Sequence, residues 1–255
     1  MKKIFIGFLL FAFFFINVGY AKETVKVGGY LFPPFVEMNN DGYTGITLDI
    51  IKAMNAFQNK YQFKFYPTAP KRRYQSFQNK EFNMIMFESK DWGWKNLSIE
   101  SSKVFSRGGE VYIALSKPGR GQNFFSDFEN KKMIGILGYH YGFAAFNNDE
   151  NFLKKKFKIK LVTTHDNIIR LILMDRYDIA VVTKSNLHKH LLNDPKIKKK
   201  LIISKKFDQI YNHTILVRKG SAPNVDEINK MLTELKKAGV LQNLWRKYGI
   251  VDSQE

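Results

Sequence analysis

Hydrophobic residues recur along this chain with two different spacings, and segments with one spacing alternate with segments with the other. Every second residue is apolar within Thr24–Gly29 and Tyr61–Tyr66, and this spacing predicts two short strands. Between them, over Ile46–Gln58, apolar residues recur every three or four positions, which predicts a helix with one buried face. A strand, a helix and a second strand in this order form the repeating unit of a parallel sheet.

The same alternation continues to the end of the chain. Further strands are predicted at Asn83–Phe87, Gly109–Leu115, Lys132–Leu137, Lys158–Val162, Asp178–Val182, Leu201–Ile203 and Asn212–Arg218. Further helices are predicted at Pro70–Asn79, from Phe143 onward, at Asp166–Met174, at Leu187–Leu192 and from about Asn224. The pattern stops at Pro118 and Gly119 and restarts at Lys132, so we expect two α/β lobes.

The first 21 residues have the layout of a secretory signal peptide. Lys2 and Lys3 precede an apolar run over Ile4–Ile16, and the small residues Gly19 and Ala21 follow. The run is about 13 residues long, whereas a helix needs roughly 20 to span a bilayer. We therefore expect cleavage after Ala21 and release of the mature chain into the periplasm; the alternative is an uncleaved membrane anchor.

Composition narrows the classes of function. The chain has no cysteine, which excludes disulfides, a thiolate nucleophile, a zinc–thiolate site and an acceptor for an N-terminal lipid. Its net charge of +18 would suit a nucleic-acid or membrane partner, but the lysines are spread along the sequence, which favours a solvated surface over nucleic-acid binding. The five histidines do not stand at metal-ligand spacing, so neither a metal nor a cofactor is expected.

Several short segments, taken in order, carry a resemblance to a known family. They are Val25–Gly28 with the Pro33, Pro34, Phe35 loop; Gly42, Gly45 and Asp49; Asn83–Phe87; Phe128–Gly138; Asp178–Val182; Ile215–Gly220; and Asn229–Gly249. Together they resemble the extracellular solute-binding proteins of family 3, the amino-acid-binding type that serves ABC importers.

The resemblance implies an α/β, two-lobed periplasmic binding protein of type II with two hinge crossover strands. Residues 22–115 and 213–255 would form lobe 1, and residues 116–212 would form lobe 2. The chain would cross between the lobes near Ser116–Gly119 and Tyr211–His213, and the lobes would close on a ligand by hinge motion.

The resemblance also indicates where a zwitterionic ligand would be bound. The family has an arginine for the carboxylate and an aspartate for the ammonium group. Counting along the segments places Lys95 at the first position and Thr183 at the second. A lysine lacks the planar fork that grips a carboxylate, and a hydroxyl cannot neutralise an ammonium group. The alternative for Lys95 is a solvated surface lysine, and the alternative for Thr183 is a residue that caps the next helix.

Other candidates lie close to these positions in the sequence. Arg73 is a second possible cation, because Pro70 and Arg73 match a motif in part of the family; the alternative is an exposed arginine. Aromatic candidates for the cleft wall are Tyr30, Phe35, Trp92 and Trp94, whereas Phe32 is expected to pack in the core.

The turn Gly138–Gly142 is predicted to stand at a helix N-terminus, where free N–H groups would face an anionic ligand group. Within it, Tyr139 and Tyr141 would narrow the pocket. Glu88 and Asp91 could instead bind a cationic group, although loop carboxylates in water are the simpler interpretation.

The predicted function is capture of a small organic solute for an ABC importer. The expected partner is a permease in the inner membrane, and the protein itself is expected to be a monomer. A receptor that senses the ligand without transport is one alternative. A dehydratase-like enzyme with Glu88 beside Lys90 or Lys95 as an acid/base pair is another. Because Lys95 and Arg73 offer positive charge, the sequence favours an anionic or neutral ligand with a planar or apolar part over a simple zwitterion.

Overall fold

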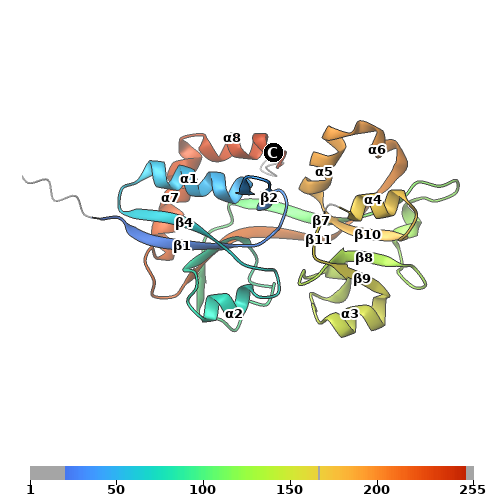
Figure 1. The fold of residues 1–255 in the computed structure, drawn as a ribbon, viewed down its shortest axis with the longest axis horizontal. Coiled ribbons are helices and arrows are strands. Elements are labelled where there is room, and N and C mark those ends of the chain that lie inside the picture. The colour runs from blue at the N-terminus through green and yellow to red at the C-terminus, as the bar shows by residue number, and fades with distance from the viewer. Residues whose placement is uncertain (1–20, 166, 251–255) are drawn as a thin grey trace, which may run out of the picture.

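The computed structural model describes residues 21–165 and 167–250, which fold into two α/β lobes (Figure 1). The predicted signal peptide and its cleavage site at Ala21 fall almost wholly in residues 1–20, outside the described residues. No helix among the described residues has the length and apolar character needed to cross a membrane.

Lobe 1 is built on strands that are parallel at its centre. Strand β1 (Glu23–Gly29) pairs in parallel with β4 (Tyr61–Pro67) and with β5 (Met84–Glu88). Its helices are α1 (Ile46–Phe57), α2 (Arg73–Gln78), α7 (Val225–Lys237) and α8 (Val240–Lys247). Two short strands, β2 (Glu37–Asn39) and β3 (Gly42–Thr44), form a hairpin, and β6 (Ile99–Ser101) borders the sheet.

Lobe 2 repeats the arrangement on a smaller scale. Strand β8 (Met133–Ile136) pairs in parallel with β9 (Ile159–Val162) and with β10 (Ile179–Thr183). Its helices are α3 (Glu150–Phe157), α4 (Ile168–Leu173), α5 (Lys184–Asn193) and α6 (Pro195–Lys200), with 3₁₀ turns η1 (Gln122–Phe125) and η2 (Gly142–Ala144).

Two long strands connect the lobes (Figure 1). Strand β7 (Ser106–Leu115) and strand β11 (Leu201–Arg218) are antiparallel partners, and their pairing extends from Leu115 opposite Leu201 to Ser106 opposite His213. They join the strands of both lobes into one sheet in the order β4-β1-β5-β11-β7-β10-β8-β9.

The first crossing differs from the expected position. Val111 and Ile113 are buried in the core of lobe 2, so β7 has already left lobe 1 before residue 111. The expected crossing at Ser116–Gly119 therefore lies several residues too late. The apolar run Val111–Leu115 belongs to the cores of lobe 2, but the sequence pattern does not tell which lobe buries an apolar strand.

Other differences concern element lengths. The predicted strands Leu201–Ile203 and Asn212–Arg218 are the two ends of the single strand β11, and the predicted helix Pro70–Asn79 is shortened to α2. The helix expected from Phe143 is only the 3₁₀ turn η2; the next α-helix, α3, begins at Glu150, where Asp149 caps it by accepting from Phe152 N.

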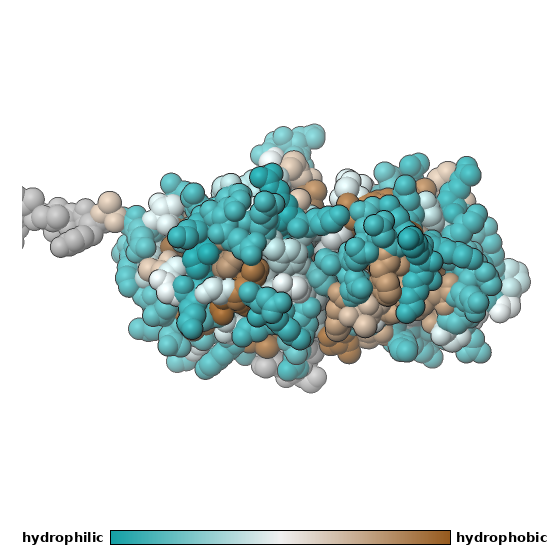
Figure 2. All heavy atoms as spheres, turned by 90° about the horizontal axis from the view of Figure 1, so that it is seen from below, coloured by the Kyte–Doolittle hydropathy of each residue, from teal (hydrophilic) through white to brown (hydrophobic). Residues whose placement is uncertain are grey.

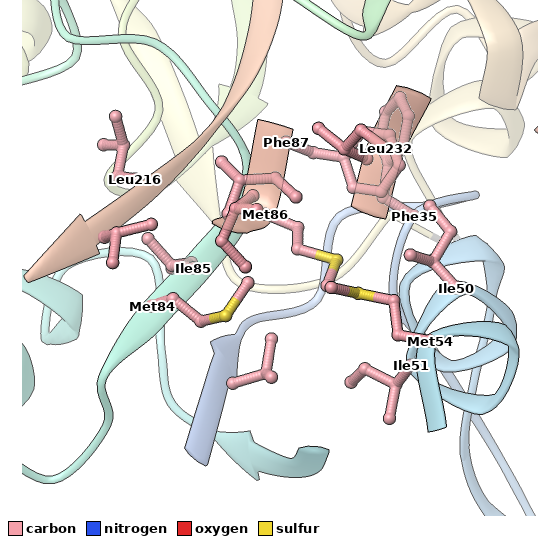
Figure 3. Close-up of a cluster of buried hydrophobic side chains, with 14 of the residues drawn as sticks. Phe35, Ile50, Ile51, Met54, Met84, Ile85, Met86, Phe87, Leu216 and Leu232 are labelled. Atoms are coloured by element: carbon pink, nitrogen blue, oxygen red, sulfur yellow. The ribbon is translucent and has the colours of Figure 1, made fainter. Parts of the chain in front are cut away.

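The core of lobe 1 lies between its sheet and helix α1. Figure 3 shows side chains from β5, including Met84 and Met86, packed toward Met54 and Ile50 of α1. Outside the cores, polar residues cover much of the face seen in Figure 2, with apolar residues gathered in a patch on each lobe.

Candidate ligand-binding site between the lobes

A small cavity lies where the two lobes and both connecting strands meet. Its lining residues are Tyr30, Phe32, Arg73 and Trp92 from lobe 1, Tyr139 and His140 from lobe 2, and Glu110 and Gln209 from β7 and β11. The cavity volume of about 10 Å³ is close to the smallest that holds one water molecule. The lobes also touch here, since the Tyr139 hydroxyl donates to Leu31 O over 3.3 Å.

Arg73 forms a buried ion pair within lobe 1. Its Nε lies 2.9 Å from Glu88 Oε1, and the indole N–H of Trp94 donates to Glu88 Oε2 over 2.7 Å. The rings of Tyr30 and Tyr74 lie 4.8 and 4.4 Å from the guanidinium carbon. Burial raises the pKa of Glu88, and the Arg73 guanidinium opposes this effect. The charge of Arg73 is thus balanced by a protein carboxylate.

The structure does not bring Lys95 to the cavity. Its side chain is 71% exposed and pairs over 2.8 Å with Asp91, four residues earlier in the chain. This corrects the expectation of a ligand-facing cation, and the solvated alternative describes both Lys95 and Asp91. The same separation leaves Glu88 without Lys95 as the partner of an acid/base pair.

Thr183 is buried at the end of β10, where it is also the N-cap residue of α5. Its hydroxyl donates to Glu110 Oε1 over 3.0 Å, and the two residues are direct partners across β10 and β7. Opposite the threonine that occupies the expected aspartate position, the structure therefore places a carboxylate on the neighbouring strand.

Four aromatic rings line the cavity: two are stacked on each other, and two stand at steep angles to these. Tyr30 and Phe32 are stacked with their centroids 5.9 Å apart. The ring of Tyr139 stands at 82° to Phe32 with centroids 5.4 Å apart, and Trp92 stands at 72° to Phe32 at 6.2 Å. Tyr30, Trp92 and Tyr139, which the sequence predicted as ligand contacts, line the cavity, and Phe32 faces the cavity as well as packing in the core.

Besides Glu88, Lys95 and Thr183, three further predicted site residues are not among the cavity lining. Phe35 packs against Phe87 in the core of lobe 1, as Figure 3 also shows. Trp94 is fully buried and reaches the site only through Glu88. Tyr141 is enclosed in lobe 2, where its hydroxyl oxygen accepts from Ile136 N over 2.5 Å. Each was predicted from its position near the cleft, but apolar contact with its own lobe decided its orientation.

The turn Gly138–Gly142 binds a carboxylate that belongs to the protein itself. Asp208 of β11 accepts from the backbone N–H groups of Gly142 and Phe143 over 2.8 Å each, and from the Tyr112 hydroxyl over 2.6 Å. The expectation of N–H groups free for an anionic ligand is therefore wrong for these two groups, because a residue distant in sequence already occupies them.

Glu110 is the functional candidate that the sequence analysis missed. It is 2% exposed, and burial raises the pKa of its carboxyl to about 8, although the hydrogen bond from Thr183 acts in the opposite direction. Among the described residues, no lysine or arginine forms an ion pair with it. A carboxylate directly before the apolar run Val111–Leu115 was the available signal, since such a position is costly to bury without a role.

Gln209 and His140 complete the polar lining, and the sequence analysis missed these also. Gln209 Oε1 accepts from Trp92 Nε1 over 3.1 Å, and its amide nitrogen donates to His140 O, so it links both lobes from β11. Burial, and secondarily Arg73, lowers the pKa of His140 to about 3. The imidazole is therefore neutral near pH 7.

Comparison with known protein families identifies the family of this chain. The model of the family described as ABC transporter, phosphonate, periplasmic substrate-binding protein matches residues 127–254, half of the chain. The chain belongs to this family. The substrate-binding role that the sequence predicted is thereby confirmed. No curated protein matches this substrate-binding protein.

Solved structures confirm the two-lobed fold. This substrate-binding protein is similar to an ABC uptake transporter substrate-binding protein from Streptococcus pneumoniae with bound histidine, with 16% identity, a TM-score of 0.73, and coverage of 91% of this chain and 95% of that one. It is similar to a mutant of ArgBP from T. maritima, with 20% identity, a TM-score of 0.69, and 89% and 95% coverage. A binding component of an ABC transporter from Wolinella succinogenes, complexed with lysine, has 17% identity, a TM-score of 0.69, and 92% and 98% coverage.

Proposed function

We propose that this substrate-binding protein captures one small organic solute between its lobes and delivers it, as a monomer, to an ABC permease in the inner membrane. The observation that supports this function is the cavity, which takes lining residues from both lobes and from both connecting strands. A ligand at this place would touch every part of the molecule that moves when the lobes close. Closure would then exclude water from the solute.

The polar side chains that line the cavity or pack behind it support capture without covalent chemistry. Glu88 is engaged by Arg73 and Trp94, and Gln209 is engaged by Trp92 and His140. These contacts fix the side chains as parts of a rigid wall, whereas general acid/base chemistry needs a group that exchanges a proton with the substrate. Two of the similar solved structures contain bound histidine and bound lysine, respectively. A nitrogen-containing solute is consistent with that likeness.

Export through a cleavable signal peptide is part of the proposal. The pattern of Lys2, Lys3 and the apolar run Ile4–Ile16 supports a leader that ends at Ala21. Without a cysteine the protein has no acceptor for an N-terminal lipid, so it would remain unattached in the periplasm.

The native protein should be isolated from the periplasmic fraction and screened for solutes by thermal shift. We expect its first residue to lie near Lys22. We also expect at least one amino acid, polyamine, organic acid or phosphonate to raise the melting temperature, because a ligand that binds only the folded state stabilises it by mass action. Retention of Ile4–Ile16 on the native protein would contradict export by cleavage, and a melting temperature unmoved by the whole panel would contradict solute capture.

A further inference from the structure

The charges around the cavity do not balance. Arg73 is neutralised by Glu88 at 2.9 Å, and the buried imidazole of His140 is neutral near pH 7. Glu110 then remains as an acidic group that faces the cavity. Among the described residues, the Thr183 hydroxyl donates a hydrogen bond to it and the Tyr211 hydroxyl lowers its pKa, but neither residue is a cation. An ionised carboxylate in such a site is stabilised by a positive charge placed beside it.

The rings beside Glu110 favour the same kind of group. The stacked rings of Tyr30 and Phe32 form one wall of the cavity. The rings of Tyr139 and Trp92 stand at 82° and 72°, respectively, to the ring of Phe32. Aromatic faces attract ammonium and guanidinium groups through the ring quadrupole, and several faces around one carboxylate form a recurrent recognition site for organic cations. An anion would instead meet both the rings and the carboxylate unfavourably.

We propose that the cleft selects a small organic cation, whose ammonium or guanidinium group is held by Glu110 and enclosed by the rings of Tyr30, Phe32, Trp92 and Tyr139. This inference rests on the proposed solute-binding function and specifies its substrate class. It replaces the anionic preference expected from Lys95 and Arg73, because Lys95 lies on the surface and Arg73 already has a carboxylate partner.

Binding should then be accompanied by release of a proton. Burial raises the pKa of Glu110 to about 8, so much of it holds a proton at pH 7, and a bound cation lowers that pKa again. The groups that act on the pKa of Glu110 are Thr183 from β10 and Asp208 and Tyr211 from β11. Glu110 in turn raises the pKa of Tyr139 and Tyr141 in the turn before η2. Asp208 raises the pKa of Glu110 and is itself bound by Gly142 and Phe143.

Calorimetry with charge-matched pairs tests this proposal. The cations arginine, lysine and choline would be compared with their neutral counterparts citrulline, norleucine and 3,3-dimethylbutanol, and with methylphosphonate as an anion. We expect at least one cation to bind, with its neutral counterpart at least 100-fold weaker. Titrations at pH 7 in buffers of different ionisation enthalpy should show a proton released on binding.

Glu110→Gln keeps the shape and the hydrogen bond from Thr183 but removes the charge. It should weaken the cation at least tenfold and abolish proton release, whereas Glu129→Gln, an exposed carboxylate in lobe 2, should leave both unchanged. A neutral or anionic solute that binds best, or a cation whose affinity Glu110→Gln alters less than twofold, would overturn the cation inference while solute binding itself stands. Failure of the whole panel to bind would overturn the proposed function as well.

Discussion

Glu110 makes the stability of the protein depend on pH. Its pKa is about 8 in the folded protein, compared with the ordinary value of 4.5 for a glutamate in the unfolded chain. The folded state therefore binds this proton more tightly than the unfolded state. The favourable contribution is therefore complete below about pH 4.5 and is lost as the pH rises through 8. We predict that the free energy of unfolding of Glu110→Gln exceeds that of the wild type by about 1 kcal/mol at pH 5 and by roughly 4 kcal/mol at pH 8.

Urea unfolding at pH 5, 6, 7 and 8 measures this difference directly. Taking the difference between variant and wild type cancels the titration of the other buried groups, notably His140 and His213, whose pKa values burial lowers to about 3. The exposed Glu129→Gln should show a difference that does not change with pH. A constant difference for Glu110→Gln would mean that its carboxyl titrates normally in the folded protein.

At the scale of elements, Asp208 fastens strand β11 to η2 and to β7. It is mostly buried and accepts hydrogen bonds from two backbone N–H groups and from the Tyr112 hydroxyl. We predict that Asp208→Ala lowers the free energy of unfolding by about 3 kcal/mol, because it leaves buried donors without an acceptor. Urea unfolding at pH 7 measures the loss.

The matched control for Asp208 is Asp91→Ala, which also removes an aspartate that has a partner. Asp91 is exposed and pairs with Lys95 in water, so its loss should cost less than about 1 kcal/mol. Equal losses in the two variants would show that the carboxylate of Asp208 does not act as a structural acceptor.

For the whole molecule, ion pairs across the cleft bias the lobes toward each other. Lys189 of α5 lies 2.7 Å from Glu37 of β2, and Lys71 lies 3.4 Å from Glu150 of α3. We predict that Glu37→Lys, which sets two lysines against each other, raises the radius of gyration measured by small-angle scattering. The double exchange with Lys189→Glu should restore the wild-type value.

Lys117→Glu provides the control for this exchange. Its ion pair with Asp175 lies within lobe 2 and does not cross the cleft, so the radius of gyration should not change. Identical scattering from wild type, Glu37→Lys and the double exchange would indicate that contacts across the cleft other than this ion pair hold the lobes together.

The sequence by itself determined most local elements. Alternation fixed β1 and β4 to within a residue, and helical spacing fixed α1, because these patterns follow from burying one face of an element. The start of α7 was equally readable: the Asn224 side chain accepts a hydrogen bond from Glu227 N, and the Glu227 carboxylate accepts one from Asn224 N. Local chemistry also indicated Tyr30, Arg73, Trp92 and Tyr139 as residues of the cleft.

Only the tertiary structure decided which strands pair with each other and which charged groups form ion pairs or hydrogen bonds. Strand β11 forms one strand because β7 pairs with it between Leu201 and His213, a contact between residues about 90 to 110 positions apart, and β5 and β6 pair with it as far as Arg218. Distant pairing likewise gives Asp208 to the turn Gly138–Gly142, Glu88 to Arg73 and Thr183 to Glu110. A ligand meets only the charges that are left unpaired after these contacts have formed. The sequence alone does not give those charges, because hydrogen bonds and ion pairs form between neighbours in space whatever their separation along the chain.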